Sequence, residues 1–183
     1  MRYVLLITMI LFGCNSQKAQ YLQKECKIEE TKDLVQFNNL YESIKIPDVY
    51  KSILENNEKD YQYEVILYKM SDNQNDRIVF VKKTNGKIIS FKKDLLSKQN
   101  FNLKEKDLET LNENLTSLEE NFYFETCNGP STNNDLYLLV IKKSGKVFIK
   151  YLAYQTVSFK KDDTNSNVDK IKKILEIMYR NSW

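Results

Sequence analysis

The sequence predicts an α+β fold in which three or four helices pack on an antiparallel sheet of about six strands. The helices are indicated by segments whose apolar residues recur at spacings of three and four, the periodicity of an amphipathic helix. The strands are indicated by six segments rich in Val, Ile, Tyr and Phe. Because short turn signals separate several of these segments, consecutive strands are expected to pair antiparallel.

The first half of the predicted domain begins with two helices and continues as a three-stranded meander. A helix is predicted over 31–45, and Pro47 interrupts it before a second helix over 48–57. The three strands are predicted at 61–70, 77–83 and 87–92. Asn85 and Gly86 separate the last two, and both residues tolerate the positive φ that a tight hairpin turn requires.

The second half is predicted to follow a similar order. An acidic helix is expected over 103–120, with strands after it at 121–127, 136–143 and 146–159. Ser144 and Gly145 are the expected hairpin turn between the last two strands. A final helix is indicated by the apolar stripe of Val168, Ile171, Ile174, Leu175 and Met178.

The two halves are similar enough to raise the hypothesis of an internal duplication. Each half consists of a helix followed by three strands, and Glu64 occupies the position in the first meander that Glu125 occupies in the second. A duplication would place two half-domains in one sheet with helices on one face. The alternative is chance similarity between two solvated hairpin tips, and a different strand order in the two halves would reject the duplication.

The first fourteen residues have the pattern of an export signal. Arg2 precedes an apolar run over 3–12 that is too short to span a bilayer, which requires about 20 residues. The sequence Leu11-Phe12-Gly13-Cys14 resembles the lipobox of bacterial lipoproteins, although that class usually has a smaller residue than Phe12. The resemblance implies cleavage before Cys14 and a diacylglyceryl group on its sulfur. An ordinary secretory signal or a buried N-terminal helix is the alternative.

This interpretation predicts three parts of the chain. Residues 1–13 are the signal peptide, 14–30 are the lipidated cysteine and its tether, and 31–183 are a single globular domain. The tether has no acidic cluster after Cys14, and in some bacterial groups such a cluster resembles a surface-export tag. A location on the periplasmic side of the cell envelope is therefore expected.

With Cys14 assigned to lipid, Cys26 and Cys127 are the two remaining thiols and form a candidate disulfide in an oxidising compartment. The alternative is two unpaired cysteines. Neither cysteine belongs to a C-x-x-C motif, so a redox-active pair is not expected.

The composition excludes several chemistries. The chain has no histidine, which removes Ser-His-Asp and Cys-His nucleophile systems and most zinc sites, and its four glycines form no phosphate-binding loop. The net charge of +3 does not favour nucleic acid as a partner. No cofactor and no metal are predicted, because the oxygen ligands between Asp72 and Asp76 lack the glycine and glutamate of a calcium loop. No catalytic residue is assigned.

Two kinds of side chain recur on the predicted strands. Lysines gather on both hairpins and are candidates for a basic surface that binds an acidic protein or anionic lipid; the candidates are Lys82, Lys83, Lys87, Lys142, Lys143 and Lys146, with Lys92, Lys93 and Lys150 nearby. The alternative is that the lysines keep exposed strand edges soluble. Aromatic residues are also frequent, at Tyr61, Tyr63, Tyr68, Phe122, Tyr123, Phe124, Tyr151 and Tyr154.

These features favour a membrane-anchored, non-catalytic module that binds another protein, as an inhibitor, an immunity-type protein or a subunit of an envelope assembly. The preference rests on small size, the anchor and the lack of a catalytic motif. The second hypothesis is binding of a small molecule or glycan by an aromatic-lined sheet face. A hydrolase acting on envelope components is the third.

Overall fold

The fold was analysed in a computed structural model that describes residues 25–42, 44–56, 58–71, 76–128, 135–154 and 165–181. These residues form four helices and eight strands, which confirms the α+β class and corrects the expected number of strands from about six to eight. The helices are α1 (Leu34–Tyr41), α2 (Asp48–Leu54), α3 (Glu105–Thr116) and α4 (Ser166–Arg180). The strands are β1 (Glu25–Thr31), β2 (Tyr63–Met70), β3 (Arg77–Thr84), β4 (Lys87–Lys93), β5 (Lys98–Asn100), β6 (Asn121–Asn128), β7 (Leu136–Lys143) and β8 (Lys146–Tyr154).

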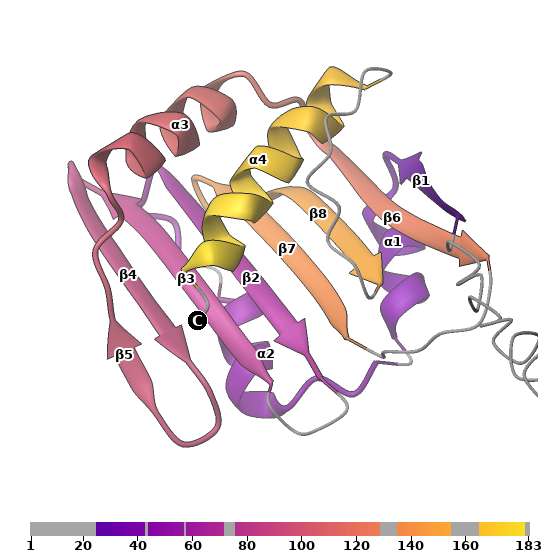
Figure 1. Cartoon of the computed structure of the whole chain (residues 1–183), viewed down its shortest axis with the longest axis horizontal. Coiled ribbons are helices and arrows are strands. Elements are labelled where there is room, and N and C mark those ends of the chain that lie inside the picture. Colours follow the sequence, from indigo (N-terminus) through magenta and orange to yellow (C-terminus); the bar gives the residue numbers. More distant parts are fainter. Residues whose placement is uncertain are drawn as a thin grey trace, which may run out of the picture.

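All eight strands belong to one sheet in the order β1-β6-β8-β7-β2-β3-β4-β5, seen face-on in Figure 1. Neighbouring strands are antiparallel except β6 and β8, which are parallel. The pairing of β2 with β7 joins the two halves of the chain into a continuous sheet. The predicted hairpin turns are confirmed, because Asn85, Gly86, Ser144 and Gly145 all have positive φ.

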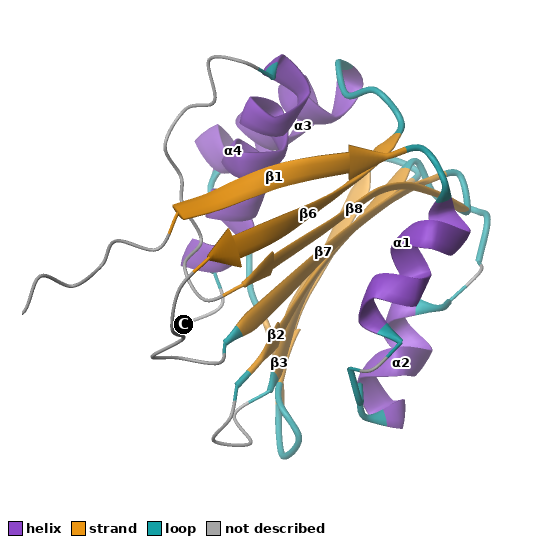
Figure 2. Cartoon of the chain, turned by 90° about the vertical axis from the view of Figure 1, so that its right-hand side faces the viewer, coloured by secondary structure: helices purple, strands orange, loops and turns teal. Residues whose placement is uncertain are grey.

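The helices cover both faces of the sheet. Figure 2 shows α1 and α2 on one side and α3 and α4 on the other. Central strands β2 and β7 are therefore buried on both faces and consist of near-continuous apolar runs rather than alternating ones. None of the helices in the described part of the chain is long and apolar enough to cross a membrane.

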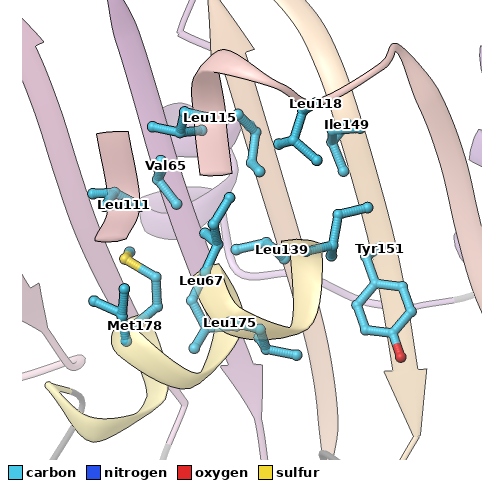
Figure 3. Close-up of a cluster of buried hydrophobic side chains, with 14 of the residues drawn as sticks. Val65, Leu67, Leu111, Leu115, Leu118, Leu139, Ile149, Tyr151, Leu175 and Met178 are labelled. Carbon is cyan, nitrogen blue, oxygen red and sulfur yellow. The ribbon is translucent and has the colours of Figure 1, made fainter. Parts of the chain in front are cut away.

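The core under α3 and α4 is built from one side of each central strand and one stripe of each helix (Figure 3). Val65 and Leu67 on β2 meet Leu111 and Leu115 on α3, while Met178 lies on α4. The side chain of Asn165 caps α4 by accepting hydrogen bonds from the backbone N–H groups of the first turn.

A second core lies under α1 and α2. It contains Phe37 of α1 and Tyr50 of α2, whose rings contact Phe122 and Tyr68 on the sheet. The hydroxyl groups of both tyrosines are satisfied by Asp76: Tyr50 donates to its backbone oxygen at 2.8 Å and Tyr68 to its carboxylate at 2.7 Å. Asp76 therefore contributes to the packing of this layer.

The duplication hypothesis is wrong. The first set of strands lies in the order β2-β3-β4, whereas the second lies in the order β6-β8-β7 and contains a parallel pair. Glu64 faces α1 and α2 with its neighbour Ile66, but Glu125 lies on the α3–α4 face with Tyr123. The matching hairpin sequences thus reflect the shared requirements of tight turns.

Two strands were not expected from the sequence. Residues 25–30, predicted to be tether, form most of β1 and pair with β6 at one edge of the sheet. The three-residue strand β5 forms the other edge and is fully polar. Both are edge strands with little apolar alternation, so that their sequences carry little strand signal.

Candidate functional site

A pocket of about 540 Å³ lies between the sheet and the layer formed by α1 and α2, and we refer to it as the α1–α2 pocket. Side chains of β7 and β8 form its floor, and the end of α2 and the α1–α2 connection form its walls. The apolar lining consists of Ile44, Ile46, Leu54, Leu138 and Val140. This volume is typical of small-molecule sites, which enclose about 300–1,000 Å³.

The local sequence explains why the helical layer is open here. Pro47 disfavours the helical conformation at Ile46, so α1 and α2 are two short helices instead of one long one. Their connection passes over the sheet as irregular chain. Its apolar side chains Ile44 and Ile46 are half-buried against the second core and leave the pocket beneath them.

Lys150 is the charged side chain at the floor of the α1–α2 pocket. It lies on β8 opposite Val140 and is only 9% exposed. Its ammonium donates a hydrogen bond to the Asn38 side chain at 2.7 Å and lies 5.8 Å from the Phe37 ring centre. Burial lowers the pKa of Lys150 to about 8, which the Glu55 carboxylate opposes and the Lys142 ammonium reinforces.

A row of buried charges lies beside the pocket on the same face of the sheet. Glu64 on β2 is directly paired with Lys82 on β3 and with Lys142 on β7. Its two carboxylate oxygens lie 3.4 Å from the Lys82 ammonium and 3.7 Å from that of Lys142. Glu64 is fully buried and Lys142 is 1% exposed, and we refer to these three residues as the Glu64 cluster.

The Glu64 cluster holds the chain between α2 and β2 against the sheet. Lys142 donates a hydrogen bond to the Asn56 backbone oxygen at 2.6 Å, and Lys82 also donates to the Glu58 carboxylate. Burial lowers the pKa of Lys142 despite the attraction of Glu64. Burial acts in the same direction on Lys82, but the Glu58 and Glu64 carboxylates raise its pKa above the ordinary value.

The six lysines predicted to form a basic surface lie on different sides of the molecule. Lys82 and Lys142 face the α1–α2 layer inside the Glu64 cluster. Lys83 and Lys143 are half-buried on the opposite face, where both are paired with Tyr63. Lys87 and Lys146 are exposed, and Lys146 forms an ion pair with Glu120 at 2.7 Å.

Most of the aromatic residues noted in the sequence are packed in the two cores of the fold. Tyr61, Tyr63, Tyr68, Phe122, Tyr123 and Tyr151 are buried, Phe124 is half-buried, and the side chain of Tyr154 lies outside the described residues. The described aromatic side chains are distributed between the two cores and do not line an open face. Cys26 and Cys127 are paired positions of the β1–β6 ladder, and Cys14 lies outside the described residues.

Sequence reasoning missed the role of Lys150 because it grouped this residue with the hairpin lysines. A usable signal existed: Lys150 lies in β8 among the apolar residues Ile149, Tyr151 and Leu152, so a lysine at this position is expected to be largely buried. Its face is not predicted by alternation, because a register shift places Phe148 on the α3–α4 side and Lys150 with Leu152 on the α1–α2 side. The helices that cover it could not be located from this alternation.

The arrangement can hold an apolar group above an ammonium. Across the described ranges, no three His, Cys, Asp or Glu side chains gather where they could bind a metal ion. Of the oxygen-rich segment between Asp72 and Asp76, which the sequence does not predict to be a calcium loop, 72–75 lie outside the described residues, and the Asp76 carboxylate accepts a hydrogen bond from the Tyr68 hydroxyl. Comparison of the chain with protein-family models, with curated proteins and with solved structures finds no match.

Proposed function

We propose that this protein is a lipid-anchored, non-enzymatic binding protein of the bacterial envelope that holds a small molecule in the α1–α2 pocket. The observation that supports this function is the coincidence of a pocket of about 540 Å³ with a buried lysine of lowered pKa on its floor. Titratable groups with perturbed pKa values are concentrated at functional sites. An apolar pocket with a few converging polar groups is the usual form of a ligand site.

The anchor in this proposal rests on the Leu11–Cys14 sequence and on its resemblance to a lipobox. Several acyl chains on one residue give stable attachment, since each buried CH₂ contributes about 0.8 kcal/mol. Expression in a bacterial host with radiolabelled palmitate tests this part. The wild-type chain should incorporate label and sediment with membranes, and Cys14→Ser should do neither; label retained in Cys14→Ser would exclude lipidation of this cysteine.

Ligand binding is tested by a thermal-shift screen with a small-molecule library. A ligand present at 100 times its Kd adds about 2.7 kcal/mol to the free energy of unfolding. Ile46→Trp fills the pocket from its wall and should abolish the stabilisation. Ile89→Trp is the matched control, because Ile89 is exposed on β4 outside the pocket lining. Equal stabilisation of both variants would place the ligand elsewhere and contradict the proposal.

The second candidate function is binding of another protein, which the sequence favours first. The turn between β4 and β5 supports it, because Leu95 and Leu96 are 52% and 99% exposed there. Exposed apolar side chains that lie together on a surface are a feature of protein-interaction sites. A stoichiometric partner recovered with the full chain should be lost with Leu96→Asp and retained with Val35→Asp, which removes an exposed apolar side chain on α1.

A further inference from the structure

We propose that the ligand of the α1–α2 pocket is a small amphiphile with a single anionic head group, and that this head group binds beside the Lys150 ammonium. This inference rests on the proposed function of the pocket and adds the chemical class of its ligand. It predicts that an apolar tail occupies the space between the sheet and the α1–α2 connection.

The first argument is the depth at which each charge lies. Lys150 extends from the sheet and is buried, next to the apolar floor residues Leu138 and Val140. The other charged side chains of the lining are exposed and come from the helical layer, namely Glu42, Lys45, Lys51 and Glu55. A ligand that reaches the floor therefore meets a cation, whereas at the rim it meets both signs of charge.

The second argument concerns the groups that surround the Lys150 ammonium. From α1 it faces the neutral Asn38 side chain and the Phe37 ring, from β7 the Lys142 ammonium, and from α2 the Glu55 carboxylate. Glu55 is exposed and lies 4.0 Å from Lys51, while Lys142 is held by Glu64. The lowered pKa of Lys150 indicates that burial outweighs the stabilisation of its positive charge. An anion at the floor would add a favourable charge interaction to the contacts that Lys150 already makes within the chain.

The third argument is the chemistry of the walls. Ile44, Ile46 and Leu54 contribute aliphatic surface to the walls, and Leu138 and Val140 contribute it to the floor beside Lys150, while polar side chains make up the rest of the lining. Hydrogen bonding and charge pairing are stronger in such surroundings than in water, but a fully hydrated anion would lose its solvation there. A ligand with an anionic head group and an apolar tail gains binding free energy both from the Lys150 ammonium and from the aliphatic side chains of the lining.

The test compares four probes that share one alkyl chain: octanoate, octyl phosphate, octanol and octylammonium. Each is titrated calorimetrically into the full chain in lipid nanodiscs, with empty nanodiscs as the blank for partition into lipid. Octanoate or octyl phosphate should bind about tenfold or more tightly than octanol, because a hydrogen bond to a charged group is worth that much or more. Octylammonium should bind more weakly than octanol. The two anions together distinguish a carboxylate from a phosphate head group.

Variants separate the role of Lys150 from that of the pocket. Lys150→Met should reduce the affinity for the preferred anion to that for octanol, and Lys150→Arg should retain most of it. Lys87→Met, which removes an exposed charge outside the pocket lining, should change the affinity by less than about threefold. Affinity for the anion should fall between pH 7 and pH 9.5 as Lys150 loses its proton, while that for octanol stays constant.

Three outcomes would overturn the inference. If octanol or octylammonium binds as tightly as the anions, or if Lys150→Met leaves anion binding unchanged, then the pocket binds a ligand of a different class. If none of the four probes binds, the amphiphile class is wrong. In each case the thermal-shift screen with Ile46→Trp still decides separately whether the pocket binds a small molecule.

Discussion

Cys26 and Cys127 are directly opposite each other in the antiparallel β1–β6 ladder, although about 100 residues of chain separate them. Directly opposed residues of antiparallel strands have Cα atoms about 4.5–5.5 Å apart. A disulfide accepts Cα separations of about 4.4–6.8 Å. The backbone thus meets the requirement that the sequence alone could not assess.

The first prediction is that Cys26 and Cys127 are bonded when the protein is produced in an oxidising compartment. The bond closes a loop of about 100 residues, for which chain entropy gives a stabilisation of up to about 4.7 kcal/mol. Thiol titration of denatured, unreduced protein should find neither cysteine free, and reduction should lower the free energy of unfolding. The double variant Cys26→Ser/Cys127→Ser controls for the reductant, and two free thiols in wild type from an oxidising compartment would contradict the prediction.

The second prediction concerns the Glu64 cluster. Glu64→Gln leaves two buried ammonium groups without their shared carboxylate and should destabilise the fold by about 3–5 kcal/mol. Glu58→Gln is the matched control, since Glu58 is exposed and pairs with the same Lys82; its cost should stay below about 1 kcal/mol. Urea unfolding measures both, and equal losses would show that burial of Glu64 is not what makes it important.

The third prediction is a pH dependence of stability due to Lys150. Its pKa of about 8 in the folded state lies below the ordinary value of 10.5, so the unfolded chain binds more protons between these two values. The contribution of Lys150 to the free energy of unfolding therefore rises with pH across this window, by less than about 3 kcal/mol. Lys150→Met should be more stable than wild type at pH 7, and this advantage should shrink between pH 8 and pH 10.5.

Urea unfolding of wild type and Lys150→Met at several pH values measures this change. The difference between the two proteins is the relevant quantity, because other groups titrate in both. Lys45→Met, at an exposed position, should differ from wild type by a constant amount. A constant difference for Lys150→Met as well would show that the buried ammonium does not lose its proton in this range.

The fourth prediction compares the two hairpin glycines. Gly86 and Gly145 both have positive φ, so replacement by Ala strains the turn in each case, at a cost of about 1 kcal/mol. A Cβ at Gly145 would also lie 2.8 Å from the Lys59 side chain and 3.2 Å from the Glu58 backbone oxygen, whereas a Cβ at Gly86 meets nothing within 4 Å. Gly145→Ala should therefore be the more destabilising variant in thermal unfolding, and equal effects would show that the Glu58–Lys59 segment moves away freely.

The elements that the sequence predicted well are those whose conformation is determined by their own residues. The stripe of α4 and the turn residues Asn85-Gly86 and Ser144-Gly145 are local signals, and the structure places helix and hairpins where they indicate. The strands at the sheet edges were missed, since β5 is polar throughout and the described interior-facing side chain of β1 is Ile28. Their strand conformation comes from backbone pairing with β4 and β6.

The candidate site likewise combines features that the sequence predicts with features that only the fold decides. The lysines at 82, 142 and 150 are visible in the sequence, but alternation along the strands does not place Lys142 and Lys150 on one face, because the register shift beside Ile141 decides it. Whether this face is solvated depends on α1 and α2, which pack over it from a distant part of the chain. The same packing pairs Glu64 with two lysines and encloses Lys150.

The sequence by itself determined the four helices and six of the eight strands, the tight turns, the lack of histidine chemistry and the lipobox-like N-terminus, because each depends on neighbouring residues or on composition. Only the tertiary structure decided the two edge strands, the strand order, the register that sets Cys26 opposite Cys127, the two-sided helical cover and the pocket above Lys150. These features depend on which apolar surfaces bury each other over long separations in the chain, and residue periodicity does not specify the partner of an apolar face.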